Sequence, residues 1–182
     1  VGAQPVASDI MNFAGKFNNG SVDIIGAPAA AFKPLELFKG LGSKGAIAQF
    51  PLVQLSLQTR LGARHHLAVG RALRPLAGEG VLLIGSGLMT HNLRERRRED
   101  GAAEPYVLEF RDWIDARIRE WDLDTLAEYR GRAPHAARAH PTDEHFQPLF
   151  FALGAAGDKV KAERLHDAVE SGVLAMDTYR FG

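Results

Sequence analysis

Cysteine is missing from this chain of 182 residues, and several kinds of chemistry are missing with it. No disulfide, no thiolate zinc site and no cysteine nucleophile can form. An excess of charge of one sign is also lacking, because 22 basic and 22 acidic residues leave a formal net charge of zero. The electrostatic signature of a general nucleic-acid or membrane-surface binder is therefore absent.

Long apolar runs and a targeting signal are lacking as well. No run approaches the roughly 20 apolar residues that a membrane span needs. The start, Val1–Pro5, is neither a Met start nor a basic-apolar signal peptide. We therefore expect a cytoplasmic protein without a membrane partner, and a chain that begins inside a longer natural protein.

Residues 1–49 differ in character from the rest of the chain. They are rich in Gly and Ala and contain no histidine. A helix is expected at Ser8–Phe17, where Ser8 can cap the first turn, and a short strand at Val22–Ile25. The pieces Gly2–Val6 and Asn19–Asp23 resemble part of a periplasmic solute-binding protein.

A regular pattern begins at Phe50. Pro51–Leu57 reads as a strand, Ala63–Ala77 as an amphipathic helix, and Val81–Ile84 as a second, buried strand. A strand, a helix and a strand with short links form a βαβ unit, so the two strands should be parallel. The chain therefore belongs to the α/β class.

The apolar run Val81–Ile84 is followed by Gly85-Ser86-Gly87 and then by His91. Ligands of open α/β sheets bind at the carboxyl ends of the strands, so His91 is well placed for proton transfer or metal binding. A plain tight turn with a half-buried imidazole explains the same residues. Position alone leaves both readings open.

Later in the chain, Pro105–Trp121 carries a helical apolar stripe. Thr142 is a good N-cap for a helix that has His145 in its first turn. A neutral imidazole there suits a metal ion, while a capping box with a packed histidine is the alternative. Lys159–Val169 is predicted to be a helix, and Val173–Phe181 to be the last strand.

Five segments together are similar in order and spacing to the C-terminal half of class III extradiol ring-cleavage dioxygenases of the DOPA 4,5-dioxygenase type. The resemblance covers about Phe50–Gly182, and its segments are Pro51–Leu57, His66–Leu73, Gly80–Gly87, Thr90–Leu93 and Pro141–His145. It implies a central mixed, largely parallel sheet flanked by helices in three layers.

The resemblance also implies an activity, which is the opening of a catechol ring by molecular oxygen at a non-haem ferrous ion, with zinc also found in the site. It implies that His145 binds the metal and that His91 lies beside the metal as a ligand and acid/base. A neutral imidazole is suited to accept a proton from a catechol hydroxyl. Ser86, Thr90 and Asn92 are the residues expected at the substrate.

One departure from the family bears on activity. Members carry further metal-binding histidines in a His-Gly-Ser-Pro stretch and a Ser-Ala-His-Trp stretch, and an Asp-His-Gly loop, and none of these occurs here. The alternatives are a non-catalytic remnant or fusion with an incomplete metal site, or a small-molecule binding module. A homodimer is a further alternative, in which a neighbour's histidines complete the site, namely His65, His66, His135 or His140.

Overall fold

The computed structural model describes residues 53–97 and 101–182. The chain divides into two compact units, Val1–Gln54 and Leu55–Gly182, and nearly all described residues belong to the second. The helix expected at Ser8–Phe17 and the strand expected at Val22–Ile25 lie outside the described residues.

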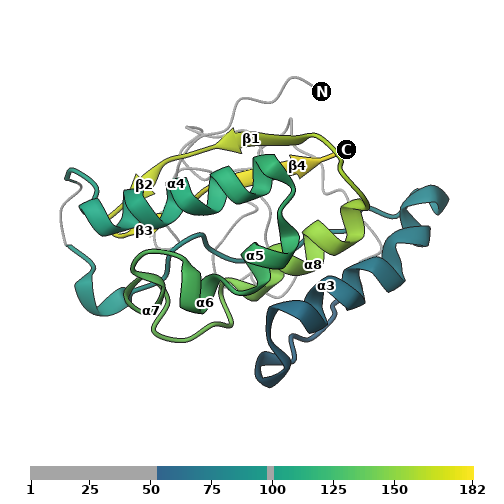
Figure 1. Ribbon diagram of the computed structural model, residues 1–182, viewed down its shortest axis with the longest axis horizontal. Coiled ribbons are helices and arrows are strands. Elements are labelled where there is room, and N and C mark those ends of the chain that lie inside the picture. Colours follow the sequence, from purple (N-terminus) through teal and green to yellow (C-terminus); the bar gives the residue numbers. More distant parts are fainter. Residues whose placement is uncertain (1–52, 98–100) are drawn as a thin grey trace, which may run out of the picture. The chain divides into compact units, whose positions relative to one another are not determined.

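Helices are the main regular elements of the second unit (Figure 1). The predicted helices at Ala63–Ala77 and Pro105–Trp121 are confirmed as α3 and α4, although α3 gives way to 3-10 turns at Arg74. Pro105 occupies the first turn of α4, where its missing N–H costs nothing. The helical elements are η2 (Thr59–Leu61), α3 (Gly62–Leu73), η3 (Arg74–Glu79), η4 (Leu93–Glu95), α4 (Pro105–Glu120), α5 (Leu123–Ala127), α6 (Tyr129–Arg132), α7 (Ala136–Ala139) and α8 (Gln147–Ala156).

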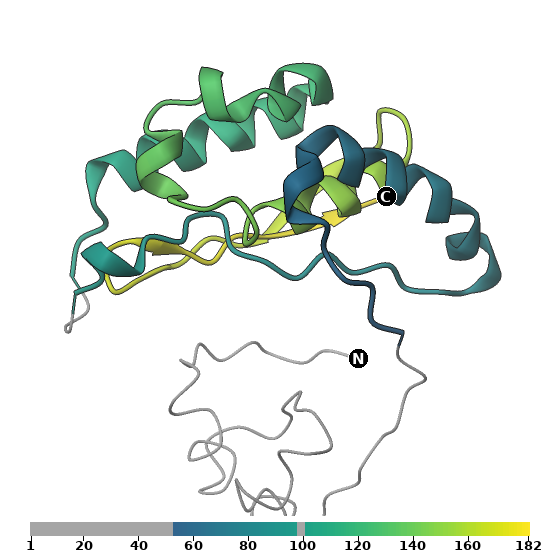
Figure 2. The same cartoon turned by 90° about the horizontal axis from the view of Figure 1, so that it is seen from below.

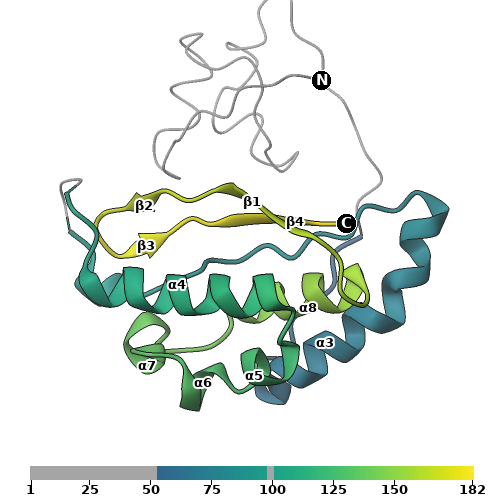
Figure 3. The same ribbon diagram turned by 45° about the horizontal axis from the view of Figure 1, so that its top comes forward.

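The strands form two small antiparallel sheets. β1 (Ala162–His166) pairs with β4 (Thr178–Phe181), and β2 (Val169–Glu170) pairs with β3 (Leu174–Ala175). Figures 2 and 3 show these strands as one layer with α4 and α8 on one side of it. The structure has helices and sheet, but a parallel sheet in three layers is not confirmed within the described part of the chain.

The two segments expected to form parallel strands are extended but unpaired among the described residues. Val81–Ile84 pairs with no strand, and Leu82 and Ile84 are 80% and 66% exposed. The described part of Pro51–Leu57 is also outside any sheet, with Val53 exposed. Large apolar side chains at these positions suit a buried sheet, which explains why the pattern reads as strand.

The helix predicted at Lys159–Val169 is wrong. Gly157 ends α8 at a φ of 104°, and Ala162–His166 then runs as a strand whose residues alternate between half-buried and exposed. This segment forms a strand because it pairs with β4 in an antiparallel ladder. Such tertiary pairing overrides weak helical periodicity.

The core lies around the long helix α4. One face of α4 is fully buried and packs against aromatic side chains from the segments that follow it. The largest fully buried residues are Phe110, Phe146, Phe150, Ile114, Ile118, Leu126 and Leu153. Among the residues that the structure describes, no helix is both long and apolar enough to cross a bilayer.

Candidate functional site

The imidazole rings of His91 and His145 stack on each other. Their centroids lie 3.6 Å apart and their planes meet at 29°. His91 follows the extended segment that begins at Val81, and His145 precedes α8. The backbone N–H of His91 donates to the Ala139 carbonyl at 2.8 Å, which fixes the His91 turn beside the segment that leads to His145. The structure therefore brings together the two histidines that the sequence singled out.

Two glycines allow the extended segment to lie directly on the start of α8. A Cβ on Gly85 would be 2.1 Å from the Pro148 carbonyl oxygen, and one on Gly87 would be 2.2 Å from that of His145. The N–H of Leu88 then donates to the His145 carbonyl at 2.8 Å. Close backbone approach, rather than a tight turn alone, is the reason for glycine here.

The electrostatics around the pair favour a neutral His91. Burial lowers the pKa of His91 and the neighbouring His145 lowers it further, while Glu144 acts in the opposite direction. Glu144 is held by the Thr142 hydroxyl, which donates to it at 2.8 Å, and this bond lowers the pKa of Glu144. His91 thus presents an uncharged nitrogen near neutral pH, as a general base requires.

A third histidine lies close by, and sequence reasoning assigned it no role within its own chain. His140 is fully buried, and its Nε2 donates to the Met89 carbonyl at 2.7 Å. Burial lowers the pKa of His140 to about 4, so the ring is uncharged at neutral pH. The available signal was its place immediately before Pro141, in the same short stretch as His145.

Thr90 and Asn92 use their polar groups within the fold. The Thr90 hydroxyl is fully buried, donates to the Val173 carbonyl at 2.8 Å and accepts from the N–H of Ala175 at 2.7 Å. The Asn92 amide donates to the Arg138 carbonyl at 2.9 Å. These bonds brace the turn on either side of His91.

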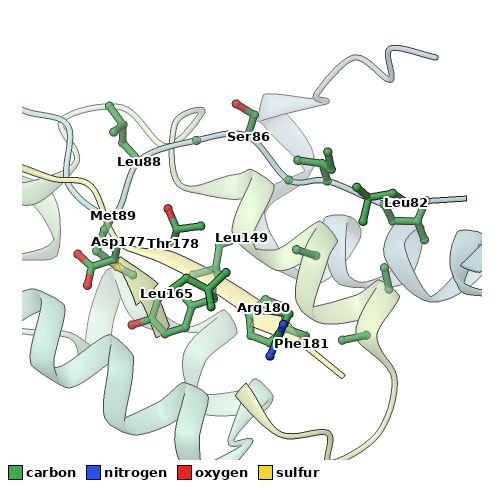
Figure 4. Close-up of a pocket in the computed structure, with 18 of the residues that line it drawn as sticks. Leu82, Ser86, Leu88, Met89, Leu149, Leu165, Asp177, Thr178, Arg180 and Phe181 are labelled. Atoms are coloured by element: carbon green, nitrogen blue, oxygen red, sulfur yellow. The ribbon is translucent and has the colours of Figure 1, made fainter. Parts of the chain in front are cut away.

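Ser86 lines a cavity of about 600 Å³ between the extended segment, α8 and β4 (Figure 4). His145 also lines this cavity. Most of its other lining side chains are apolar, among them Leu82, Leu88, Leu149, Leu165 and Phe181. An apolar pocket with few polar groups is the usual form of a small-molecule site.

The described residues supply two nitrogen donors but not a complete metal site. Within residues 53–97 and 101–182, no group of three or more His, Cys, Asp or Glu side chains could hold an ion. All seven histidines fall in this described part of the chain. Zinc and non-haem iron sites generally take at least three protein ligands, so the His91–His145 pair alone falls short.

Comparison with known proteins divides the chain in two. Residues 1–74 match the family model described as solute-binding protein AdeT 1/2. The probable solute-binding protein AdeT1 of Acinetobacter baumannii is 59% identical over 56 residues, which are 31% of this chain and 18% of that protein.

The larger match is to dioxygenases. The 4,5-DOPA dioxygenase extradiol of Beta vulgaris is 37% identical over 134 residues, or 74% of this chain and 50% of that protein. The chain therefore spans about half the length of such curated relatives. A crystal structure of an uncharacterized protein from Escherichia coli K12 superposes with a TM-score of 0.66 at 26% identity, covering 86% of this chain and 73% of that one.

Other plant and bacterial proteins of the same name agree with these matches. Across them the identity is 29–41% over about 74% of the chain. About three quarters of this chain is therefore a region of the class III extradiol dioxygenase type.

Proposed function

We propose that the chain takes part in extradiol ring cleavage, the oxidative opening of a catechol ring by O2 at a non-haem ferrous ion. The observation that carries the proposal is the stacking of the His91 and His145 rings, with centroids 3.6 Å apart. Relatives named as 4,5-DOPA dioxygenase extradiol supply the reaction class.

His91 is the group that moves a proton in this proposal. Its lowered pKa leaves the imidazole uncharged near neutral pH, so one ring nitrogen can accept a proton from a catechol hydroxyl bound beside it. Partial burial of the ring is the largest cause of the lowered pKa.

His145 is the proposed metal ligand, and His91 would be a second ligand beside it. Fe(II) is the proposed cofactor and zinc the other ion that imidazoles suit. Because the described residues hold no group of three donors, further ligands have to come from elsewhere, and a second copy of the chain is one source.

Ser86 is the proposed substrate contact, because it lines the cavity that His145 borders. Thr90 and Asn92 are not proposed as substrate contacts. Their hydrogen bonds stabilise the turn that carries His91.

A non-catalytic chain is the second candidate, and the missing third donor favours it. Such a chain keeps the fold of the dioxygenase region while binding iron weakly. It differs from the first candidate in one measurable respect, which is turnover of catechol.

The test is to load the full chain with Fe(II) without oxygen, add a catechol, and then admit O2. Oxygen uptake together with a yellow ring-opened product is expected, and both should be lost in His91→Gln and His145→Gln. His166→Gln is the matched control, because His166 lies at the end of β1 and is not among the histidines considered for the metal site. Weak or absent Fe(II) binding together with no oxygen uptake would favour the non-catalytic chain.

A further inference from the structure

His140 connects the segments that carry His91 and His145. Its Nε2 donates to the Met89 carbonyl at 2.7 Å, and the neighbouring Ala139 carbonyl accepts from the N–H of His91 at 2.8 Å. Two consecutive residues, Ala139 and His140, thus bind the backbone groups of His91 and Met89. Because these bonds flank Thr90, they fix the direction in which the chain leaves the turn.

The segment that contains Ala139 and His140 continues to His145, and its His145 end also contacts the segment that carries His91. The N–H of Leu88 donates to the His145 carbonyl at 2.8 Å. Contacts at both ends of the stretch from Ala139 to His145 hold it along the segment from Leu88 to His91. The side-chain bond from His140 is the contact in this set that a substitution can remove directly.

The chemistry of His140 argues that packing alone does not explain the residue. A carbonyl only accepts hydrogen bonds, so the proton lies on Nε2 and the Nδ1 atom carries a lone pair. This Nδ1 is buried and finds no donor within the described part of the chain. The ring packs between Phe110 and Phe146, with centroids 5.7 Å and 4.8 Å away. A phenyl group would fill the same space without an unpaired Nδ1, but it would leave the Met89 carbonyl without its donor.

We propose that His140 is a positioning residue, which holds the His91 turn against the His145 segment through its Nε2–H bond to Met89 and so keeps the two site imidazoles stacked. The proposal rests on the proposed function only in taking that pair as the site. It requires no bound metal, substrate or oxygen.

The test uses metal-free full-length chain with isotope-labelled histidine, and measures the NOE between the ring protons of His91 and His145 by NMR. His140→Gln keeps an N–H donor at the end of a side chain of similar reach, and His140→Phe keeps the aromatic packing but has no donor. The cross-peak should persist in wild type and in His140→Gln and be lost in His140→Phe. His135→Phe is the control for adding a phenyl group elsewhere, and should leave it unchanged.

A wild-type cross-peak that survives at full intensity in His140→Phe would overturn the proposal. Should His140→Phe fail to fold, the wild-type protein still decides, because ring 15N shifts report which nitrogen of His140 carries the proton. A proton on Nδ1 would overturn the proposal, and one on Nε2 supports it. Neither readout depends on turnover, so failure of the positioning role and failure of the dioxygenase activity are distinguishable.

Discussion

The backbone of Gly87 lies directly against the carbonyl oxygen of His145. A Cβ at position 87 would be 2.2 Å from that oxygen, a distance that real side chains do not adopt. The approach is needed because Leu88, the next residue, donates its N–H to the same carbonyl. The alignment of the histidine pair thus depends on the absence of a side chain.

Gly87→Ala should push the extended segment away from α8 and separate the His91 and His145 rings. We expect a loss of stability of about 1–3 kcal/mol, as for other overpacked sites, together with loss of the NOE between the two rings. Urea unfolding and NMR measure the two effects. Gly78→Ala is the control, since a Cβ there meets nothing within 4 Å. Equal stability of the two variants would contradict the prediction.

A second close approach holds α3 on α8. A Cβ on Gly70 would lie 2.1 Å from the Phe151 carbonyl oxygen. Gly70→Ala should therefore cost about 1–3 kcal/mol from overpacking, despite the better helix propensity of alanine. A Cβ on Gly131, in α6, would meet nothing within 4 Å. Gly131→Ala should therefore raise the free energy of unfolding by up to about 1 kcal/mol. Thermal unfolding of the pair checks this, and a more stable Gly70→Ala would refute it.

Thr90→Val tests whether the Thr90 hydroxyl serves the fold. The substitution keeps the shape but leaves the Val173 carbonyl and the Ala175 N–H without their partner. Each buried, unsatisfied group costs about 1–3 kcal/mol, so a loss of about 2–4 kcal/mol is expected in denaturant unfolding. Thr178→Val, at an exposed residue of β4, should change stability by less than about 0.5 kcal/mol. Similar values for both would show that Thr90 is free for another role.

Asp177 should make the protein less stable as pH rises from 4 to 7. Burial raises its pKa from 3.8 to about 6, although Arg111 and Arg164 partly offset this and Asp167 adds to it. Above a pH of 3.8 the unfolded state releases this proton, whereas the folded state keeps it until the pH reaches about 6. The free energy of unfolding therefore falls as the pH rises through this range.

Asp177→Asn removes this titration and isolates it from the other carboxylates, several of which have lowered pKa values and act in the opposite sense. Relative to the variant, wild type should lose about 1–2 kcal/mol between pH 4 and pH 7, after allowance for solvent screening. Urea unfolding at a series of pH values measures the difference. A difference that is constant across the range would contradict the prediction.

The long helices could be predicted because each repeats apolar residues at helical spacing and begins or ends at a recognisable residue. Pro105 lies in the first turn of α4, and Gly80 ends η3 in the left-handed conformation, at a φ of 84°. The strand β1 was missed because five residues paired with β4 leave only a weak alternation in the sequence. Pairing partners distant in sequence cannot be found from a local pattern.

The site was predictable in part for the same reason. His91 follows the apolar run Val81–Ile84, and the family resemblance joins it to His145. The helix predicted to have Thr142 as its N-cap and His145 in its first turn is wrong at its start, because α8 begins at Gln147 with Phe146 as its N-cap. For His140 the sequence offers only its place beside Pro141 in the stretch that contains His145, and the bond from His140 to the Met89 backbone is not predictable from any spacing. The hydrogen bonds of Thr90 and Asn92 to Val173 and Arg138 are likewise contacts that only the folded chain defines.

The exposed row of Leu82 and Ile84 has a practical consequence for handling the protein. Exposed apolar side chains on an unpaired, extended segment promote self-association of the protein. The attraction weakens on cooling and strengthens in sulfate or phosphate. The solubility of the protein should therefore be highest at low temperature and in dilute chloride buffers. Ammonium sulfate should precipitate the protein at a low salt concentration.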